Sequence, residues 1–257
     1  MTRVLVLALT VALMPMAALA EPCPGNPDAL GTERVLAIDA RSTPRVGRKQ
    51  FPGTLPLAPK EIVLTFDDGP WPTTTPKVLD ALRHECVRAT FFLLGRNAEA
   101  YPKIARRELA EGHSIGHHSF SHPLLGHMPL ARALAEIDRG IAADELALHG
   151  QRNSRPSTPF FRFPGFVSNQ ALLDALAERG IVVFGADVWA SDWLPMSPEQ
   201  ELNLILARIE HAGRGIVLFH DTKKQTAQML PAFLRALKRR GFHVVHVVSA
   251  QNRGISN

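Results

Sequence analysis

Two adjacent carboxylates and a pair of histidines are the residues of this sequence best suited to metal-assisted hydrolysis. Asp67 and Asp68 directly follow an apolar run. His118 and His122 lie four residues apart, a spacing that puts two rings on one face of a helical turn. Two imidazole nitrogens and one carboxylate oxygen would suit zinc with an open coordination position, and other divalent first-row metals accept the same ligands.

Both patterns also have ordinary structural explanations. An Asp-Gly-Pro sequence commonly forms only a turn, and histidines often cap loops. However, five of the 11 histidines fall between His113 and His127, a density that surface positions rarely reach. Adjacent side chains at a strand end diverge, so Asp67 and Asp68 could serve different partners. One could hold a metal while the other faces a water molecule.

Three further polar segments follow apolar runs nearer the C-terminus. Arg162 stands among phenylalanines, where burial would require a carboxylate partner. Asp187 and the Asp192–Trp193 pair follow another apolar run, and His220 ends a third. Taken singly, these patterns fit a surface arginine, a loop with a packed tryptophan and a core or capping histidine equally well.

The elements that must position these groups alternate from about residue 60 onward. Short β-rich runs and longer helical patterns follow one another, which predicts a parallel sheet. We expect an α/β fold, a distorted or incomplete (β/α) barrel with about seven parallel strands. Glycines 112, 180 and 241 follow three of the helices, where left-handed caps are expected. The expected strands are 62–66, 89–94, 114–116, 160–163, 181–186, 215–219 and 243–248, and the expected helices are 75–84, 101–112, 130–148, 169–179, 198–212 and 225–240.

In parallel α/β barrels the reactive groups gather at the carboxyl ends of the strands. Asp67, His118, Arg162, Asp187 and His220 each lie at or just after the end of an expected strand. We therefore expect these distant residues to converge on one rim of the barrel.

Residues 1–20 have the composition of a signal peptide. Arg3 gives a basic start, residues 4–19 are almost wholly apolar, and an Ala-Leu-Ala end provides the small residues that signal peptidase requires. An uncleaved membrane anchor is the alternative, because the run is near the shortest that spans a bilayer. Pro15 and the Ala-Leu-Ala end favour cleavage. We expect an exported protein, periplasmic or extracellular, with no membrane insertion after cleavage.

Residues 21–60 are rich in proline, glycine and arginine and show little periodicity, so we expect an extended N-terminal arm over a folded domain of residues 61–250. Cys23 and Cys86 are the only cysteines. In an exported chain they could form one disulfide that pins the arm, or stay as two unpaired thiols, and we favour the disulfide. Two cysteines are too few for a thiolate zinc site.

The charge balance excludes a strongly basic surface. The chain has 29 Lys and Arg against 24 Asp and Glu, a net charge of +5, without long basic runs. This predicts no nucleic-acid partner, because such proteins concentrate basic residues on one face. A weak attraction to an anionic cell-wall polymer is compatible with the charge. We expect a monomer.

Five motifs, taken in order, resemble those of the polysaccharide deacetylase family, carbohydrate esterase family 4, to which the chitooligosaccharide deacetylases belong. The similarity spans roughly residues 62–248, and the first two motifs are the most specific. The motifs are TFDDGP (65–70), HSFSH (118–122), RFP (162–164), DW (192–193) and LFH (218–220).

The resemblance implies a role for each matching residue in removing acetyl groups from a polysaccharide. It implies a divalent metal, most simply Zn²⁺, held by a carboxylate and two imidazoles, with a carboxylate base on one side and a histidine acid on the other. The implied metal ligands are Asp68, His118 and His122; the base is Asp67, oriented by Arg162; the acid is His220, tuned by Asp192; and the substrate-binding residues are Trp193, Leu218 and Pro164.

Two departures from the family pattern place substrate preference, rather than the reaction, in question. Gly165 and then Phe166 follow Pro164, where the family usually has an aromatic residue. Trp189 stands where the family usually has an aspartate, and Asp187 two residues earlier could substitute for it. The leading hypothesis is N-deacetylation of a GlcNAc polymer, either peptidoglycan or a chitin-like oligosaccharide. An O-acetyl ester deacetylase acting on xylan-type polysaccharide and an inactive glycan-binding domain are the alternatives.

Overall fold

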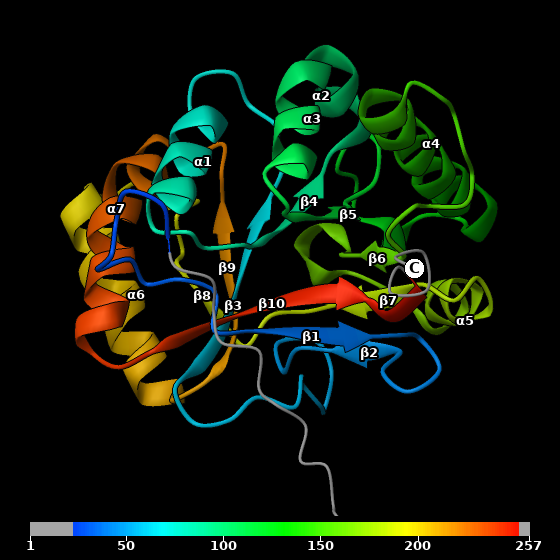
Figure 1. Ribbon diagram of the computed structural model, residues 1–257. Helices are drawn as coiled ribbons and strands as arrows, with labels where there is room; N and C mark the ends of the chain where they lie inside the picture. Colours follow the sequence, from blue (N-terminus) through cyan, green and yellow to red (C-terminus); the bar gives the residue numbers. More distant parts are fainter. Residues whose placement is uncertain (1–22, 252–257) are drawn as a thin grey trace, which may run out of the picture.

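The structure, a computed structural model, describes residues 23–251 and forms one parallel α/β sheet wrapped by helices (Figure 1). The predicted signal peptide, residues 1–20, lies outside the described residues. All strand pairs are parallel. The strands are β1 (Arg34–Ile38), β2 (Arg45–Val46), β3 (Glu61–Asp67), β4 (Thr90–Leu93), β5 (Ser114–His117), β6 (Phe160–Phe161), β7 (Val182–Phe184), β8 (Val188–Trp189), β9 (Gly215–His220) and β10 (His243–Ser249).

The sheet curves into a distorted barrel. Its main path runs β8-β9-β3-β4-β5-β6-β7-β2, and β10 pairs with the first residues of β3 and with β1. Strands β7 and β8, near opposite ends of this path, are joined by only three residues, 185–187. This short connection brings the two ends of the sheet together and closes the barrel without a hydrogen-bonded pair between β7 and β9.

Helices surround the sheet (Figure 1). Helices α1, α6 and α7 cover one side, with α7 packed between α1 and α6, and α4 packs against α2, α3 and α5 on the other. Two short 3₁₀ turns, η1 (Leu125–His127) and η2 (Pro164–Phe166), lie in the loops. The helices are α1 (Thr75–His84), α2 (Gly95–Ala100), α3 (Pro102–Ala110), α4 (Leu130–His149), α5 (Gln170–Glu178), α6 (Pro198–Ala212) and α7 (Lys224–Arg239).

The two-residue period of a strand decides which groups face the barrel interior. In β3, Ile62, Leu64 and Phe66 belong to the hydrophobic cluster beneath the helices. The intervening Val63 packs in a separate cluster with side chains from β4, β6, β7 and β9 inside the barrel. Asp67 lies four residues beyond Val63, so it falls on the same inner side, at the carboxyl end of the strand.

The predicted strands and helices all form, most of them with shifted ends, and helices α1 and α6 have the predicted bounds. The expected number of about seven strands is too low. The sheet has ten strands, because β1 and β2 lie in the arm and β8 follows β7 directly. Strands of two residues, such as β2 and β8, show no period that a sequence could reveal. Helix α2 was also not predicted. Glycines 112, 180 and 241 all have positive φ, as expected of left-handed caps.

The arm predicted at residues 21–60 is part of the sheet over two short stretches. Strand β1 pairs with β10, and β2 pairs with β7. Beyond β2, Gly47 approaches Gly185 so closely that a Cβ on either residue would overlap the other backbone. This contact fixes the chain that follows β2 against the short connection that closes the barrel. Among the residues that the structure describes, no helix is long and apolar enough to span a bilayer.

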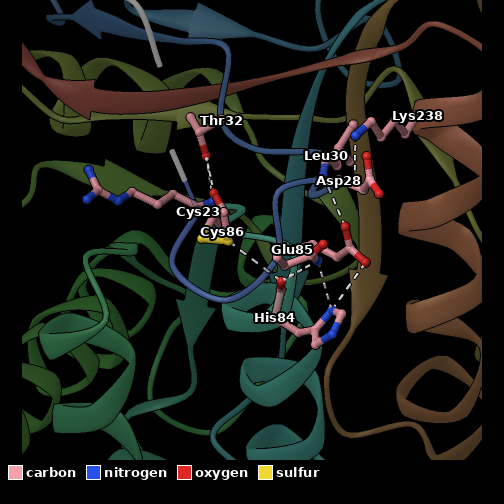
Figure 2. The surroundings of a disulfide bond; sticks show 10 residues. Cys23, Asp28, Leu30, Thr32, His84, Glu85, Cys86 and Lys238 are labelled. Carbon is pink, nitrogen blue, oxygen red and sulfur yellow. Dashed lines mark hydrogen bonds and ion pairs between the residues drawn. A yellow bond between two sulfur atoms is a disulfide. The ribbon is translucent and has the colours of Figure 1, made fainter. Parts of the chain in front are cut away.

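A disulfide between Cys23 and Cys86 fastens the start of the arm to the end of α1, as predicted (Figure 2). Polar contacts reinforce this attachment. The Leu30 backbone N–H donates to Oε2 of Glu85 at 3.0 Å, and the Thr32 hydroxyl donates to the Cys86 carbonyl at 3.3 Å. The arm is therefore held at both ends, by the disulfide and by its contacts with β7.

Replacing Cys23 and Cys86 with serine is expected to destabilise the protein. The bond closes a loop with a sequence separation of 63, for which the chain-entropy treatment gives a loss of about 4 kcal/mol in the free energy of unfolding. Urea denaturation of the double variant and of the oxidised parent would measure the difference. An unchanged unfolding midpoint would show that the bond contributes nothing to stability.

Candidate active site

Most of the predicted site residues line a cleft at the carboxyl ends of the parallel strands. Two acidic, three histidine and several aromatic side chains form its wall, and two lysines lie on it. The lining residues are Lys49, Asp67, Asp68, His118, His122, Phe163, Gly165, Phe166, Trp189, Trp193, Leu218, His220 and Lys223.

Asp68, His118 and His122 form a cluster that could hold a metal ion, with one ligand atom of each within 4.8 Å of the others. Oδ1 of Asp68 lies 3.6 Å from Nε2 of His118 and 3.5 Å from Nε2 of His122. The segment between the histidines is not the helical turn that their spacing predicted. Ser119 and His122 both have a φ of 70°, and this left-handed bend brings the rings together.

The hydrogen bond of His118 turns an electron-pair donor of its ring toward Asp68. Nδ1 of His118 lies 2.7 Å from the Arg162 carbonyl, which can only accept, so Nδ1 carries the proton. Burial lowers the pKa of His118 to about 3, so the ring is neutral and Nε2 presents its lone pair toward Asp68. Oδ1 of Asp68 is buried and accepts no hydrogen bond from any group of residues 23–251. A cation satisfies all three groups at once.

Asp67 diverges from Asp68 and forms a buried ion pair with Arg162. Nη1 of Arg162 donates to Oδ1 of Asp67 at 2.7 Å and to the Thr65 hydroxyl at 2.9 Å, and the backbone carbonyls of Phe184 and Gly185 accept from the remaining nitrogens. Arg162 is fully buried. Its predicted need for a carboxylate partner is met by Asp67.

Burial and the neighbouring cation act on Asp67 in opposite directions. Burial raises the pKa of this carboxyl above that of an ordinary aspartate, and the charge of Arg162 opposes the rise. Arg162 therefore favours the ionised form, as expected, although burial outweighs it. A carboxylate of raised pKa is a stronger proton acceptor than an exposed aspartate.

His220 and Asp192 form the second polar pair of the cleft. Nδ1 of His220 lies 2.7 Å from Oδ1 of Asp192, and Oδ2 of Asp192 accepts from the His220 backbone N–H at 2.7 Å. Burial alone would lower the pKa of His220, but the hydrogen bond and charge of Asp192, with the charges of Asp68 and Asp67, raise it to about 9. The ring is therefore protonated at neutral pH.

A second buried carboxyl lies behind Asp192. The Thr226 hydroxyl is 3.0 Å from Oδ2 of Asp192 and 2.8 Å from Oε1 of Glu201. One hydroxyl proton serves only one of these acceptors. Burial raises the pKa of Glu201 to about 7, and the hydrogen bond from Thr226 opposes the rise. Thr226 therefore links the buried Glu201 to the aspartate that binds His220.

The predicted substrate-binding residues are placed differently from one another. Trp193 is half exposed, with its ring edge-on to His220, and Leu218 lies in the cleft wall. Pro164 is buried and is not among the residues that line this cleft. Its neighbours Gly165 and Phe166 line it instead, and both have positive φ.

Asp187 does not reach the cleft. Its carboxylate accepts hydrogen bonds from the Arg48 backbone N–H at 3.0 Å, the Thr54 hydroxyl at 2.5 Å and the Ile216 backbone N–H at 2.8 Å. It therefore anchors the arm to β9 and does not replace the family aspartate in the cleft. Trp189, which occupies that family position, lines the cleft.

Several residues of the site were not predicted from the sequence. Glu201 shares the buried stripe of α6 with Ile205 and Ile209, and a charged residue on an apolar stripe is the signal that could have revealed it. Asn97 of α2 donates to the Asp68 carbonyl at 2.7 Å. Lys49 and Lys223 carried no sequence signal.

The fold and the site define a parallel α/β barrel with a two-histidine, one-carboxylate cluster at its rim. The family model described as polysaccharide deacetylase matches residues 55–184. The chain belongs to the polysaccharide deacetylase family.

Characterised relatives and solved structures agree with this assignment. The peptidoglycan-N-acetylglucosamine deacetylase of Listeria monocytogenes is 33% identical over 87% of this chain, and the chain spans about half, 47%, of that protein's length. A chitooligosaccharide deacetylase of Azorhizobium caulinodans is 34% identical, over 70% of this chain and 90% of its own. The structure of a Bdellovibrio bacteriovorus peptidoglycan deacetylase covers 87% of this chain and 61% of its own, at 33% identity and a TM-score of 0.75.

Proposed function

We propose that this chain is a metal-dependent hydrolase that removes N-acetyl groups from a GlcNAc-containing polysaccharide, either peptidoglycan or a chitin-like oligosaccharide. The observation that carries the proposal is the buried oxygen of Asp68, which faces two imidazoles and accepts no hydrogen bond from any group of the described residues. A base, Asp67, and an acid, His220, lie beside this cluster. The names of the relatives support the substrate class.

The proposed metal ligands are Asp68, His118 and His122, and zinc is the proposed metal. Tetrahedral zinc with nitrogen and oxygen ligands at about 2.0–2.1 Å places neighbouring ligand atoms about 3.4 Å apart. The separations of 3.5 and 3.6 Å within the cluster suit that geometry. When bound, a divalent cation lowers the pKa of water and polarises the substrate carbonyl.

The remaining residues handle the protons. Asp67 accepts a proton from the attacking water, and Arg162 holds the carboxylate in place through its 2.7 Å hydrogen bond. His220 donates a proton from Nε2 to the departing amine nitrogen, while Asp192 binds Nδ1. Oδ2 of Asp67 lies 3.9 Å from Nε2 of His118, and Nε2 of His220 lies 4.0 Å from Oδ2 of Asp68. The base and the acid therefore both border the cluster.

Trp193 and Leu218 are proposed to enclose the acetyl methyl group, because both line the cleft beside His220. The Cys23–Cys86 disulfide supports export to an oxidising compartment, periplasmic or extracellular. The monomeric state remains a prediction.

Acetate release by the metal-loaded mature protein, residues 21–257, tests the proposed function. We expect release from N-acetylglucosamine oligomers or peptidoglycan, identified by mass spectrometry of the glycan products. Acetylated xylan is the control for the ester alternative, and release from xylan alone would replace the amide assignment. Glycan binding without turnover across several metals would instead support an inactive binding domain.

Replacing Asp192 with asparagine is expected to move the alkaline limb of the kcat/KM profile to lower pH. The raised pKa of His220 keeps the acid protonated below about pH 9, and activity is lost as pH rises through that value. Removing the charge of Asp192 lowers this pKa. A bound cation offsets the charges of Asp67 and Asp68 equally in the parent and in the variant. The test is therefore the direction in which the alkaline limb moves between the two. An unmoved limb would contradict the pairing.

A further inference from the structure

The N-terminal arm contributes a cation to the cleft. After β2, the Lys49 backbone N–H donates to the Ala186 carbonyl at 2.7 Å, and the Arg48 N–H donates to Asp187 at 3.0 Å. With the close approach of Gly47 to Gly185, these contacts fix the backbone on both sides of Lys49. The position of its side chain at the cleft is therefore set by the fold.

The Lys49 side chain lies against the cleft wall. Its ammonium group is 4.5 Å from the centre of the Trp189 ring, and the Arg208 guanidinium lies 5.7 Å from the same ring. These cation–π contacts hold the ring and the ammonium group together. Trp189 stands where the family usually has an aspartate. Lys49 of the arm and Trp189 therefore form one continuous part of the cleft wall.

A second lysine of the cleft follows His220 closely in the chain. Lys223 immediately precedes α7, and its backbone N–H donates to the His220 carbonyl at 3.1 Å. It lines the cleft and also the adjoining hollow, which contains Arg96 and Trp71 and shares Asp68 and His122 with the cleft. Cations therefore line both the cleft and the adjoining hollow.

These cations have no acidic partner within residues 23–251: Lys49, Lys223 and Arg96 each lack an ion pair there. The two carboxylates of the cleft are already engaged, since Asp67 pairs with Arg162 and Asp68 faces the two histidines. A negatively charged group on the substrate would therefore meet two cations in the cleft that have no acidic partner among the described residues. A neutral N-acetylglucosamine oligomer offers none, whereas the lactyl ether of an N-acetylmuramic acid residue carries a free carboxylate wherever no peptide is attached to it.

We propose that the cleft selects glycans that bear a carboxylate beside the acetylated sugar, and that Lys49 and Lys223 recognise this group. The proposal rests on the deacetylase function and narrows its substrate class to acidic glycans of the muramic acid type. The arm is then a specificity-determining part of the site.

Two probes that differ only in charge test this inference. One is an alternating N-acetylglucosamine–N-acetylmuramic acid oligomer with free carboxylates, and the other is the same oligomer with each carboxylate converted to a primary amide. The ratio of kcat/KM for acid to amide is expected to exceed 1 in the parent protein. Lys49→Gln and Lys223→Gln are each expected to lower the ratio about 3-fold, as for other partly exposed ion pairs, mainly through KM.

Lys103→Gln is the matched control, because Lys103 is an exposed lysine on α3 that does not line the cleft. It should leave the ratio at the parent value, and added salt should lower the parent ratio. If the acid-to-amide ratio of kcat/KM is 1 in the parent protein, or if neither cleft substitution changes it, the inference is wrong and the proposed function is unaffected. Absence of acetate release from both probes and from neutral oligomers overturns the proposed function as well.

Discussion

Replacing Asp67 with asparagine is expected to lower acetate release by at least about 1000-fold, within the range that general base catalysis contributes. Asparagine retains the shape of the side chain and an oxygen that can accept from Arg162, but it cannot take up a proton from water. Release of acetate from N-acetylated oligomers by the metal-loaded variant would measure the loss.

The variant leaves Arg162 as a buried cation without a charged partner, so its stability must be measured alongside its activity. Thr65 and the carbonyls of Phe184 and Gly185 still accept from the guanidinium, and we expect the fold to persist with a loss of about 3–5 kcal/mol. Normal metal content and a cooperative unfolding transition would confirm that the site is intact. Full activity in a folded variant would remove Asp67 as the base.

Replacing His118 with alanine is expected to have the second large effect, on metal binding. Loss of a residue that only supports a metal ligand commonly weakens binding about 10–100-fold, and loss of a ligand should cost at least about 100-fold. Calorimetric titration with Zn²⁺ would give the change in affinity, and acetate release should fall with it.

His127 offers the matched control, because it is an exposed histidine of η1 outside the cluster. His127→Ala should bind metal and release acetate as the parent does. Chelation of the parent protein should abolish release, and titration with several divalent metals should identify the ion that restores it. Equal affinities for His118→Ala and the parent would disprove the proposed ligand set.

The sequence was most informative where local pattern and chemistry coincide. Asp67 is placed by the two-residue period of β3, which is visible in the sequence as an apolar run ending in a carboxylate. The sequence correctly placed His118 and His122 close together, but on a helical turn that does not form. The positive φ of Ser119 and His122, which brings the rings together, cannot be predicted from the residue types. Their meeting with Asp68 depends on the barrel, and the alternation of strands and helices predicted that barrel.

The sequence could not predict contacts of residues that belong to no recognisable motif or periodic pattern. Lys49 belongs to an arm without periodicity, and only the pairing of β2 with β7 places it in the cleft. Asp187 looks like a candidate for the cleft, yet its carboxylate is engaged by Arg48, Thr54 and Ile216. In both cases long-range backbone geometry, rather than local propensity, determines the role.

The paired glycines at 47 and 185 have a practical consequence for protein engineering. Because neither position accommodates a Cβ, a library should keep both fixed, together with the buried Phe51. It can vary the exposed Lys49 while the catalytic groups on β3 and β9 and the residues 118–122 remain untouched. New glycan preferences could then be selected without reoptimising the chemistry.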